Sequence, residues 1–178
     1  MRIDAGGRCD AALWIPSPNF DARPETTGIE LLVVHAISLP PGEFGGPWID
    51  ALFQNRLDPE AHPYFRQIEG LEVSAHFLIR RDGELRQYVA THDRAWHAGA
   101  STWKGRERCN DFSIGIELEG ADDVPFAEPQ YDTLADLTHA LFERHGRLEL
   151  AGHSDIAPGR KTDPGPWFEW ARFLAAVT

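Results

Sequence analysis

The chain has 178 residues, which is the size of one ordinary domain with one well-covered core, so we expect a single domain over residues 1–178. Hydrophobic residues make up 42% of the sequence and aromatic residues 11%, a composition too apolar for a disordered chain. The formal net charge of −11 would repel a phosphate backbone, and no basic cluster interrupts the acidic background, so we expect no nucleic-acid partner.

The amino-terminal segment and the cysteines bear on the compartment. The segment MRIDAGGRCDAALWIPSPNF lacks the basic start and apolar run that secretion requires, and no apolar stretch is long enough to span a bilayer. We therefore expect a cytosolic (cytoplasmic) protein without a membrane partner. Cys9 and Cys109 could form at most one bridge, and a reducing compartment would keep both as free, structural thiols.

The first predicted strand is the apolar run ELLVVHAI at 30–37, a pattern typical of a strand buried on both faces in the middle of a sheet. Its histidine, His35, lies near the carboxyl end. The segment 38–70 that follows is punctuated by proline and glycine and has room for one short helix. Long loops of this kind tend to be functional, so we expect it to form one wall of a cleft beside His35; without that histidine, an ordinary surface loop would be favoured.

Two short strands are predicted next, SAHFLIRR at 74–81 and ELRQYVA at 84–90, around the dipeptide Asp82-Gly83, which favours a hairpin turn. We expect this hairpin to flank the strand at 30–37. A third strand, FSIGIELEG at 112–120, alternates strictly. One face carries Ile114, Ile116 and Leu118, and the other carries Gly115, Glu117 and Glu119. Two carboxylates thus share one face of this strand.

Two helices complete the predicted elements. Apolar positions at helical spacing predict a helix over about 129–145, with Pro129 in its first turn and Gly146 at its C-cap. A second helix is predicted to begin near Pro166. Its expected buried stripe consists of Trp167, Trp170, Phe173 and Leu174. Helices packed on a mixed sheet make this an α/β (α+β) domain.

The stretch AGHSDIAPGRKTDPG at 151–165 gathers His153, Lys161 and Asp163 between glycines and prolines. His35, His153 and Asp163 each lie where a loop leaves a regular element. Two imidazoles and one carboxylate suit zinc and leave a fourth position for water, which is the catalytic form of a zinc site.

The other histidines carry less weight, because a lone histidine is more often a hydrogen-bonded scaffold residue than a ligand. We apply that reading to His62, His92, His139 and His145. No HExxH motif is present, so a zincin-type protease is disfavoured. His76 could support the core or a ligand, whereas His97, in AWHAG, has the setting of a residue in a cleft wall.

Six motifs, in the same order along the chain, resemble those of the AmpD-type cytosolic amidases of bacterial peptidoglycan recycling. They are LLVVHAISLPPGEFGGPWIDALF, HPYF, VSAHFLIRRDGELRQYV, RAWHAGAS, GRERCNDFSIGIELEG and GHSDIAPGRKTDPGP, and the similarity extends from about Pro16 to Phe173. The resemblance implies the fold shared with peptidoglycan-recognition proteins and T7-type lysozyme amidases, a mixed sheet packed by helices with zinc at one edge.

The resemblance also implies a reaction. It is hydrolysis of the amide that joins the lactyl group of N-acetyl-1,6-anhydromuramic acid to L-alanine of the stem peptide, with a consequent link to β-lactamase induction. The expected substrate is an anhydromuropeptide, the expected cofactor is one zinc ion per chain, and we expect a monomer. In those enzymes the residues that match His35, His153 and Asp163 bind zinc, and those that match Glu117 and Lys161 are catalytic.

The chemistry is consistent with these roles. Glu117 would take a proton from water and later deliver one to the leaving amine, and Lys161 would place positive charge on the developing oxyanion. Glu119 shares a strand face with Glu117 and competes with it for the role of base. Periodicity does not separate the two, and the family match favours Glu117.

Substrate contacts are assigned to four further residues. Trp96 and His97 could present an aromatic wall to sugar and peptide, and Arg108 could pair with a carboxylate of the acidic stem peptide. Many relatives carry asparagine directly after the first ligand, where this chain has Ala36, and many carry cysteine where it has Ser154. Both differences bear on substrate affinity rather than on the reaction.

Two alternatives to a recycling amidase remain. A noncatalytic muropeptide-binding module could use the same fold, but such receptors commonly lack a complete ligand set. An amidase that acts on the intact cell wall would need export, for which the sequence shows no signal.

Overall fold

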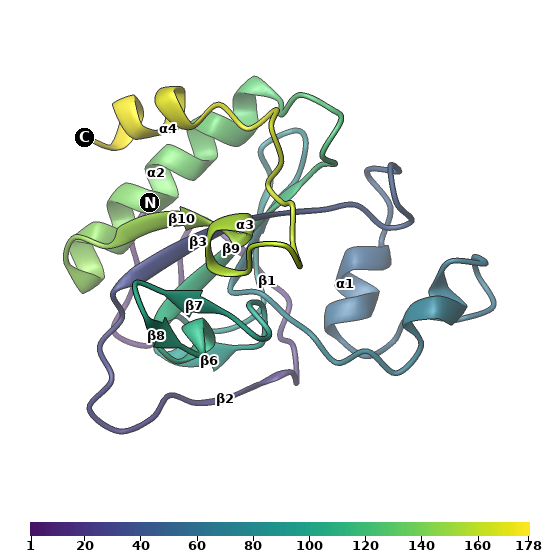
Figure 1. Cartoon of the computed structure of the whole chain (residues 1–178), viewed down its shortest axis with the longest axis horizontal. Coiled ribbons are helices and arrows are strands. Elements are labelled where there is room, and N and C mark those ends of the chain that lie inside the picture. Colours follow the sequence, from purple (N-terminus) through teal and green to yellow (C-terminus); the bar gives the residue numbers. More distant parts are fainter.

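A six-stranded mixed sheet forms the centre of the protein, whose computed structural model describes all of residues 1–178 (Figure 1). In spatial order its strands are β1 (Leu13–Trp14), β5 (Leu85–Gln87), β4 (Phe77–Ile79), β9 (Ser113–Glu119), β3 (Leu31–Ile37) and β10 (Glu149–Gly152). The strand β3 is parallel to both β9 and β10, and β4 is parallel to β9 but antiparallel to β5. Two small sheets lie outside it, β2 (Phe20–Ala22) with β6 (Asp93–Ala95), and β7 (Thr102–Trp103) with β8 (Arg106–Glu107).

The α-helices are α1 (Trp48–Phe53), α2 (Glu128–His145), α3 (His153–Ile156) and α4 (Trp170–Val177), and short 3₁₀ turns occupy Phe65–Ile68 and Cys109–Asp111. Helices α2 and α4 contact each other on one face of the sheet, and α1 packs on the other face near the β4–β5 hairpin (Figure 1). None of the helices is both long and apolar enough to cross a lipid bilayer.

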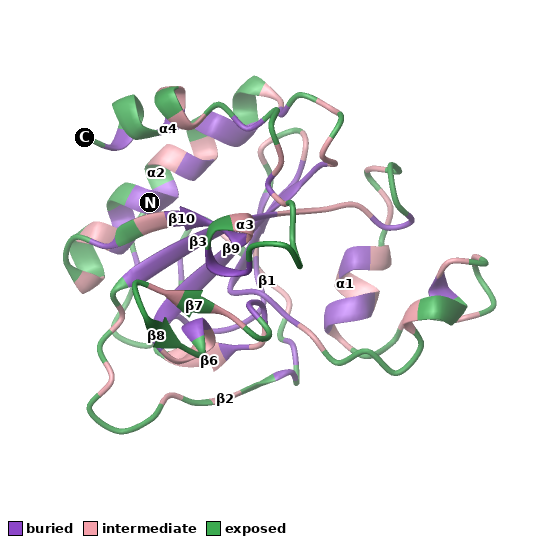
Figure 2. Ribbon diagram, in the orientation of Figure 1, coloured by how far each residue is buried: buried purple, intermediate pink, exposed green.

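The alternation of β9 divides the interior into layers. Ile114, Ile116 and Leu118 join the main core against α2, and every residue of β9 is buried (Figure 2). Gly115, Glu117 and Glu119 therefore project from the opposite face, as predicted. The carboxylates of β9 therefore lie on this face, because the apolar residues of the strand occupy the opposite face.

The fold class, the strands, the hairpin and the first predicted helix are confirmed. Helix α2 begins within one residue of the expected start and ends before Gly146, whose φ of 85° needs the conformational freedom of glycine. The segment 38–70 contains the expected short helix, α1. Cys9 and Cys109 are both buried, in separate hydrophobic clusters.

The predicted position of the hairpin is wrong. Its strand β4 pairs with β9, and β9 lies between the hairpin and β3. The physical reason is that β3 and β9 are both buried on both faces. Their sequence patterns therefore do not reveal which of the two strands the hairpin joins.

The predicted start of the last helix is also wrong. Helix α4 begins at Trp170 rather than near Pro166, and Trp167 and Leu174 are 51% and 44% exposed. Phe168, from the turn that precedes the helix, fills the interior instead, with its ring centroid 5.5 Å from that of Tyr131 and 4.8 Å from that of Trp170. The spacing of Trp167, Trp170, Phe173 and Leu174 predicted a helix from Pro166, but a turn there places the ring of Phe168 in the core instead.

Two Leu→Ala substitutions test this assignment of the core. Leu137→Ala, at a fully buried position of α2, should lower the free energy of unfolding by about 2–5 kcal/mol because it leaves a cavity. Leu174→Ala, at an exposed position of α4, should change it by less than about 0.5 kcal/mol. Urea denaturation measures both, and equal losses would contradict the packing of α4.

Candidate active site

The site lies at the carboxyl ends of β3 and β10. These strands pair in parallel with Val34 opposite Gly152, so the next residues, His35 and His153, are neighbours at one edge of the sheet. Asp163 comes from the loop after α3, which is held close because the Ser154 N–H donates to the Asp163 carbonyl oxygen at 2.9 Å. Sheet register and one backbone hydrogen bond thus bring three residues together from distant parts of the sequence.

Three donor atoms converge at this point. Nδ1 of His35 lies 2.9 Å from Nδ1 of His153, and Oδ2 of Asp163 lies 3.3 Å and 3.1 Å from them respectively. Tetrahedral ligands with metal bonds of about 2.0–2.1 Å lie about 3.3 Å apart, close to these separations. Two imidazole nitrogens and one carboxylate oxygen, held in this way, could hold a metal ion.

The charge states of these groups suit metal binding. Burial lowers the pKa of His35 to about 4, so at neutral pH the ring keeps a lone pair. Burial alone would raise the pKa of Asp163, but its close polar contacts with the imidazoles of His153 and His35 outweigh it and hold that pKa well below its usual range. Asp163 is therefore ionised and contributes one negative charge to the site.

Glu117 lies beside the three donors. In the parallel pairing of β3 with β9 it stands directly opposite His35, so both side chains project from the same face. Glu117 is 8% exposed, and its Oε2 is buried without a hydrogen-bond partner. Burial raises the pKa of Glu117 well above 4.5, the charge of Asp163 raises it further, and the ammonium of Lys161 opposes both. The raised pKa means that this carboxyl group binds a proton tightly. No group of the protein hydrogen-bonds to its Oε2.

Glu119 is engaged elsewhere. Its Oε1 accepts the backbone N–H of Gly45 at 2.7 Å, its Oε2 accepts that of Arg81 at 3.2 Å, and Nη1 of Arg80 lies 3.5 Å away. The side chain is buried and does not line the cleft that Glu117 faces. The two carboxylates that periodicity could not separate therefore have different surroundings.

A cleft of about 550 Å³ opens over the site. The segment after His35 contributes to its wall, as predicted for residues 38–70, and so do Asp122 and Arg160 to Thr162. The cleft is lined by Ala36, Ile37, Ser38, Leu39, Pro41, Leu52, Phe53, Tyr64, Ile68, Leu71, Val73, Ser74, Trp96, His97, Glu117, Gly120, Ala121, Asp122, His153, Arg160, Lys161, Thr162 and Asp163. The lining thus combines many apolar side chains with a polar group that includes two cations.

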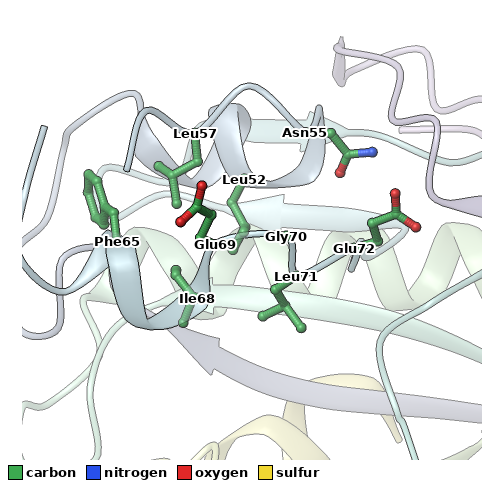
Figure 3. A pocket seen from close by; sticks show the side chains of 9 residues that line it. All are labelled: Leu52, Asn55, Leu57, Phe65, Ile68, Glu69, Gly70, Leu71 and Glu72. Atoms are coloured by element: carbon green, nitrogen blue, oxygen red, sulfur yellow. The ribbon is translucent and has the colours of Figure 1, made fainter. Parts of the chain in front are cut away.

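A smaller hollow of about 120 Å³ adjoins the cleft behind α1, and Figure 3 shows the side chains that surround it. Its lining is Leu52, Asn55, Leu57, Phe65, Ile68, Glu69, Gly70, Leu71 and Glu72. Leu52, Ile68 and Leu71 line both spaces, so the two hollows share a wall.

The predicted substrate residues divide into two groups. Ala36, Trp96 and His97 line the cleft, and the indole N–H of Trp96 donates to Oδ1 of Asp21 at 3.3 Å, which holds its ring. Arg108 lines a neighbouring hollow instead, with its side chain 69% exposed and 3.3 Å from Asp111. The substrate roles of these residues remain predictions.

Sequence reasoning did not single out Arg160, which lines both the cleft and the hollow beside Arg108. Its Nη2 donates to the carbonyl oxygens of Ala98 at 2.6 Å and Ala100 at 2.7 Å. The available signal was its position next to Lys161 in the basic pair RK.

The scaffold reading of the remaining histidines fits their surroundings. His76 is fully buried, and its Nδ1 accepts the backbone N–H of Gly115 at 3.0 Å. His145 lies 2.9 Å from the hydroxyl of Thr91. Neither these residues nor the others given that reading, His62, His92 and His139, line the cleft.

Comparison with known proteins bears on this site. The sequence profile of the N-acetylmuramoyl-L-alanine amidase family matches residues 25–166. The 1,6-anhydro-N-acetylmuramyl-L-alanine amidase AmpD of Citrobacter freundii is 59% identical over 180 residues, which cover 100% of this chain and 96% of that protein. A crystal structure of a selenomethionine derivative of AmpD, also 59% identical, superimposes with a TM-score of 0.97 and full coverage of both chains.

A more distant structure holds a ligand. The amidase AmiD of Escherichia coli, in complex with anhydro-N-acetylmuramic acid-L-Ala-D-gamma-Glu-L-Lys, is 29% identical and has a TM-score of 0.61. The match covers 86% of this chain and 60% of that one. The mixed sheet and its helices are therefore the fold of these amidases.

The different surroundings of the two carboxylates predict opposite effects on stability. Glu117→Gln should raise the free energy of unfolding of the metal-stripped protein at neutral pH, because it removes a buried, incompletely partnered carboxylate. Glu119→Gln should lower it by about 1.5–3 kcal/mol, because charge-assisted hydrogen bonds are lost. Urea denaturation in the presence of a chelator compares the variants.

The gain from Glu117→Gln should depend on pH. The folded-state pKa of Glu117 is raised, so its contribution to stability is complete below pH 4.5 and is lost as the pH rises towards the folded-state value. The advantage of the glutamine variant should therefore grow from about pH 4.5 to neutral pH. A gain that is independent of pH would show that Glu117 ionises freely in the folded protein.

Proposed function

Because the chain belongs to the N-acetylmuramoyl-L-alanine amidase family and is an enzyme of that kind, we propose that it is a zinc-dependent hydrolase that cleaves the lactyl-L-alanine amide of 1,6-anhydro-N-acetylmuramoyl peptides. One observation carries the proposal. The donor atoms of His35, His153 and Asp163 converge beside Glu117 in a single cleft. A noncatalytic module would have no use for this combination.

The three donors fit zinc, with one ion per chain held by His35, His153 and Asp163. Zinc in such a site supplies Lewis acidity, which polarises a carbonyl group and lowers the pKa of water to about 7. The three ligands leave a coordination position free, as hydrolytic zinc sites require.

Glu117 acts as the general base and then as the general acid. Its unpartnered Oε2 is free to take a proton from the attacking water, and its raised pKa allows it to keep that proton until the amine leaves. An amine is a poor leaving group unless it is protonated, so one carboxyl group serves in both steps. This is the reason for a buried position, since an exposed glutamate would lose the proton to solvent at neutral pH.

Lys161 supplies positive charge within the cleft. Its ammonium lines the same cleft and lowers the cost of negative charge at Glu117. A cation in this place would stabilise the oxyanion that forms when water adds to the amide carbonyl.

The rest of the cleft fits a sugar-linked peptide. Trp96 offers a flat aromatic ring, and Arg160 contributes a second cation near Lys161. Support for the ligand class comes from AmiD, which was crystallised with an anhydromuramoyl peptide. In this proposal residues 1–178 act as one amidase domain. Action as a monomer in the cytosol, without membrane or nucleic acid, and a link to β-lactamase induction remain predictions.

Two variants separate metal binding from proton transfer. Asp163→Ala should lose bound zinc and turnover together, whereas Glu117→Ala should keep zinc and lose about 10²–10⁴-fold in kcat. Zinc is measured by elemental analysis, and anhydro-N-acetylmuramic acid and free peptide by mass spectrometry of an anhydromuramoyl-tripeptide digest. A fully active Glu117→Ala would remove Glu117 from the mechanism.

The role of Lys161 has a matched control, because the sequence contains one other lysine, Lys104, which pairs with Glu149 outside the cleft. Lys161→Met should lower kcat by about 10²–10³-fold, the cost of losing one oxyanion donor. Lys104→Met should leave kcat unchanged. Equal effects would mean that the lysine acts on stability rather than on the reaction.

A further inference from the structure

We propose that His97 is a positioning residue of the metal centre, whose Nδ1 accepts a hydrogen bond from Nε2–H of His35 and thereby leaves Nδ1 of His35 free for the metal. This inference rests on the proposed zinc site and concerns a residue outside the ligand set. His97 shares the cleft with substrate, yet both of its ring nitrogens are engaged inside the protein.

The contacts form a chain of three side chains. Nε2 of His35 lies 2.9 Å from Nδ1 of His97, and Nε2 of His97 lies 3.1 Å from Oγ of Ser113. The His35 and His97 rings meet edge to face with centroids 5.0 Å apart, and all three residues are buried. No solvent is needed to complete the chain.

The chain can run in two directions, because a neutral imidazole carries one N–H and a hydroxyl can donate or accept. If Ser113 accepts from His97, then His97 accepts from His35, and Nδ1 of His35 keeps its lone pair. If the chain is reversed, the proton of His35 sits on Nδ1 and points at Asp163, 3.3 Å away. Only the first direction leaves an atom for a metal, and His97 supplies the acceptor that it requires.

Ala98, which follows His97, accepts a hydrogen bond from the second histidine ligand, His153. The carbonyl oxygen of Ala98 lies 3.2 Å from Nε2 of His153, which places that proton on Nε2 and leaves Nδ1 for the metal. Oδ1 of Asn110 accepts the backbone N–H groups of both His97 and Ala98, at 3.1 Å and 2.8 Å. One dipeptide, fixed by one amide side chain, therefore orients both imidazole ligands. Such outer partners commonly set the tautomer of metal-binding histidines.

The position of His97 depends on a missing side chain. A Cβ placed on Gly115 would lie 2.5 Å from Cγ of His97, closer than any real contact. Gly115 is two residues before Glu117 on the same face of β9, so the strand that presents the carboxyl group also leaves the space in which His97 packs.

The test compares zinc affinities by competition with a chromophoric chelator. His97→Phe keeps a ring but accepts no hydrogen bond, and it should bind zinc about 10–100-fold more weakly than wild type. His97→Gln, whose Oε1 can accept from His35, should recover most of the affinity. His145→Phe is the control, because His145 hydrogen-bonds the hydroxyl of Thr91 and does not line the cleft, and it should leave the affinity unchanged.

A second readout reports the tautomer directly. Long-range ¹⁵N NMR of zinc-loaded wild type should show His35 protonated at Nε2, and metal-free His97→Phe should show a shift of His35 towards the Nδ1–H form. If His97→Phe does not fold, Asn110→Ala, which loosens the dipeptide without altering a ring, should weaken zinc binding in the same direction.

The outcomes are distinct. Wild-type zinc affinity in folded His97→Phe, or in Asn110→Ala if only that variant folds, would overturn the positioning role. Equal losses in His97→Phe and His145→Phe would also overturn it, since they would reflect general destabilisation. A wild-type protein that binds no zinc would refute the proposed function itself, and this role of His97 with it.

Discussion

The parallel pairing of β3 with its two neighbours is the constraint on which the site depends. One neighbour sets His35 opposite Glu117, and the other sets His35 beside His153. A shift of one residue in the β3–β9 register would turn Glu117 into the apolar core and bring Ile116 or Leu118 to the cleft. The buried apolar residues on the far face of β9 oppose such a shift, so the hydrophobic core fixes the geometry of the chemistry.

The same arrangement carries an energetic cost. A carboxyl group is buried beside a second carboxylate, with one oxygen lacking a partner. Nε of Arg23 is the one other buried side-chain nitrogen or oxygen atom without a partner, whereas Glu119 has two backbone donors and an arginine. The poorly partnered carboxyl group therefore lies where the proposed mechanism exchanges a proton, which is a common compromise between stability and function.

Local sequence patterns predicted the individual strands and helices. They did not predict which of these elements pair or pack together. Strict alternation predicted β9, and helical spacing predicted α2 almost to the residue. The neighbour of the hairpin and the start of α4 depended on contacts between distant segments, such as that of Phe168 with Tyr131. For the site, residue type and position at the ends of predicted elements supplied the candidate ligands, and the family resemblance supplied Glu117 and Lys161. The hydrogen bond from Gly45 to Glu119 and that from the His97 backbone to Asn110 could not be predicted from sequence periodicity. Each joins residues that do not belong to one periodic segment.

The cleft wall built by residues 38–70 has a further consequence for how this fold can diversify. The wall packs against the sheet through its own hydrophobic cluster, and its one side-chain hydrogen bond to β9 joins Gly45 to Glu119, whereas the proposed metal ligands lie on β3, α3 and the following loop. Insertions or deletions between these ties would alter the shape and depth of the binding surface while leaving the reacting groups in register. Lineages with this architecture could therefore exchange one peptide preference for another by varying loop length, with the hydrolytic centre inherited intact.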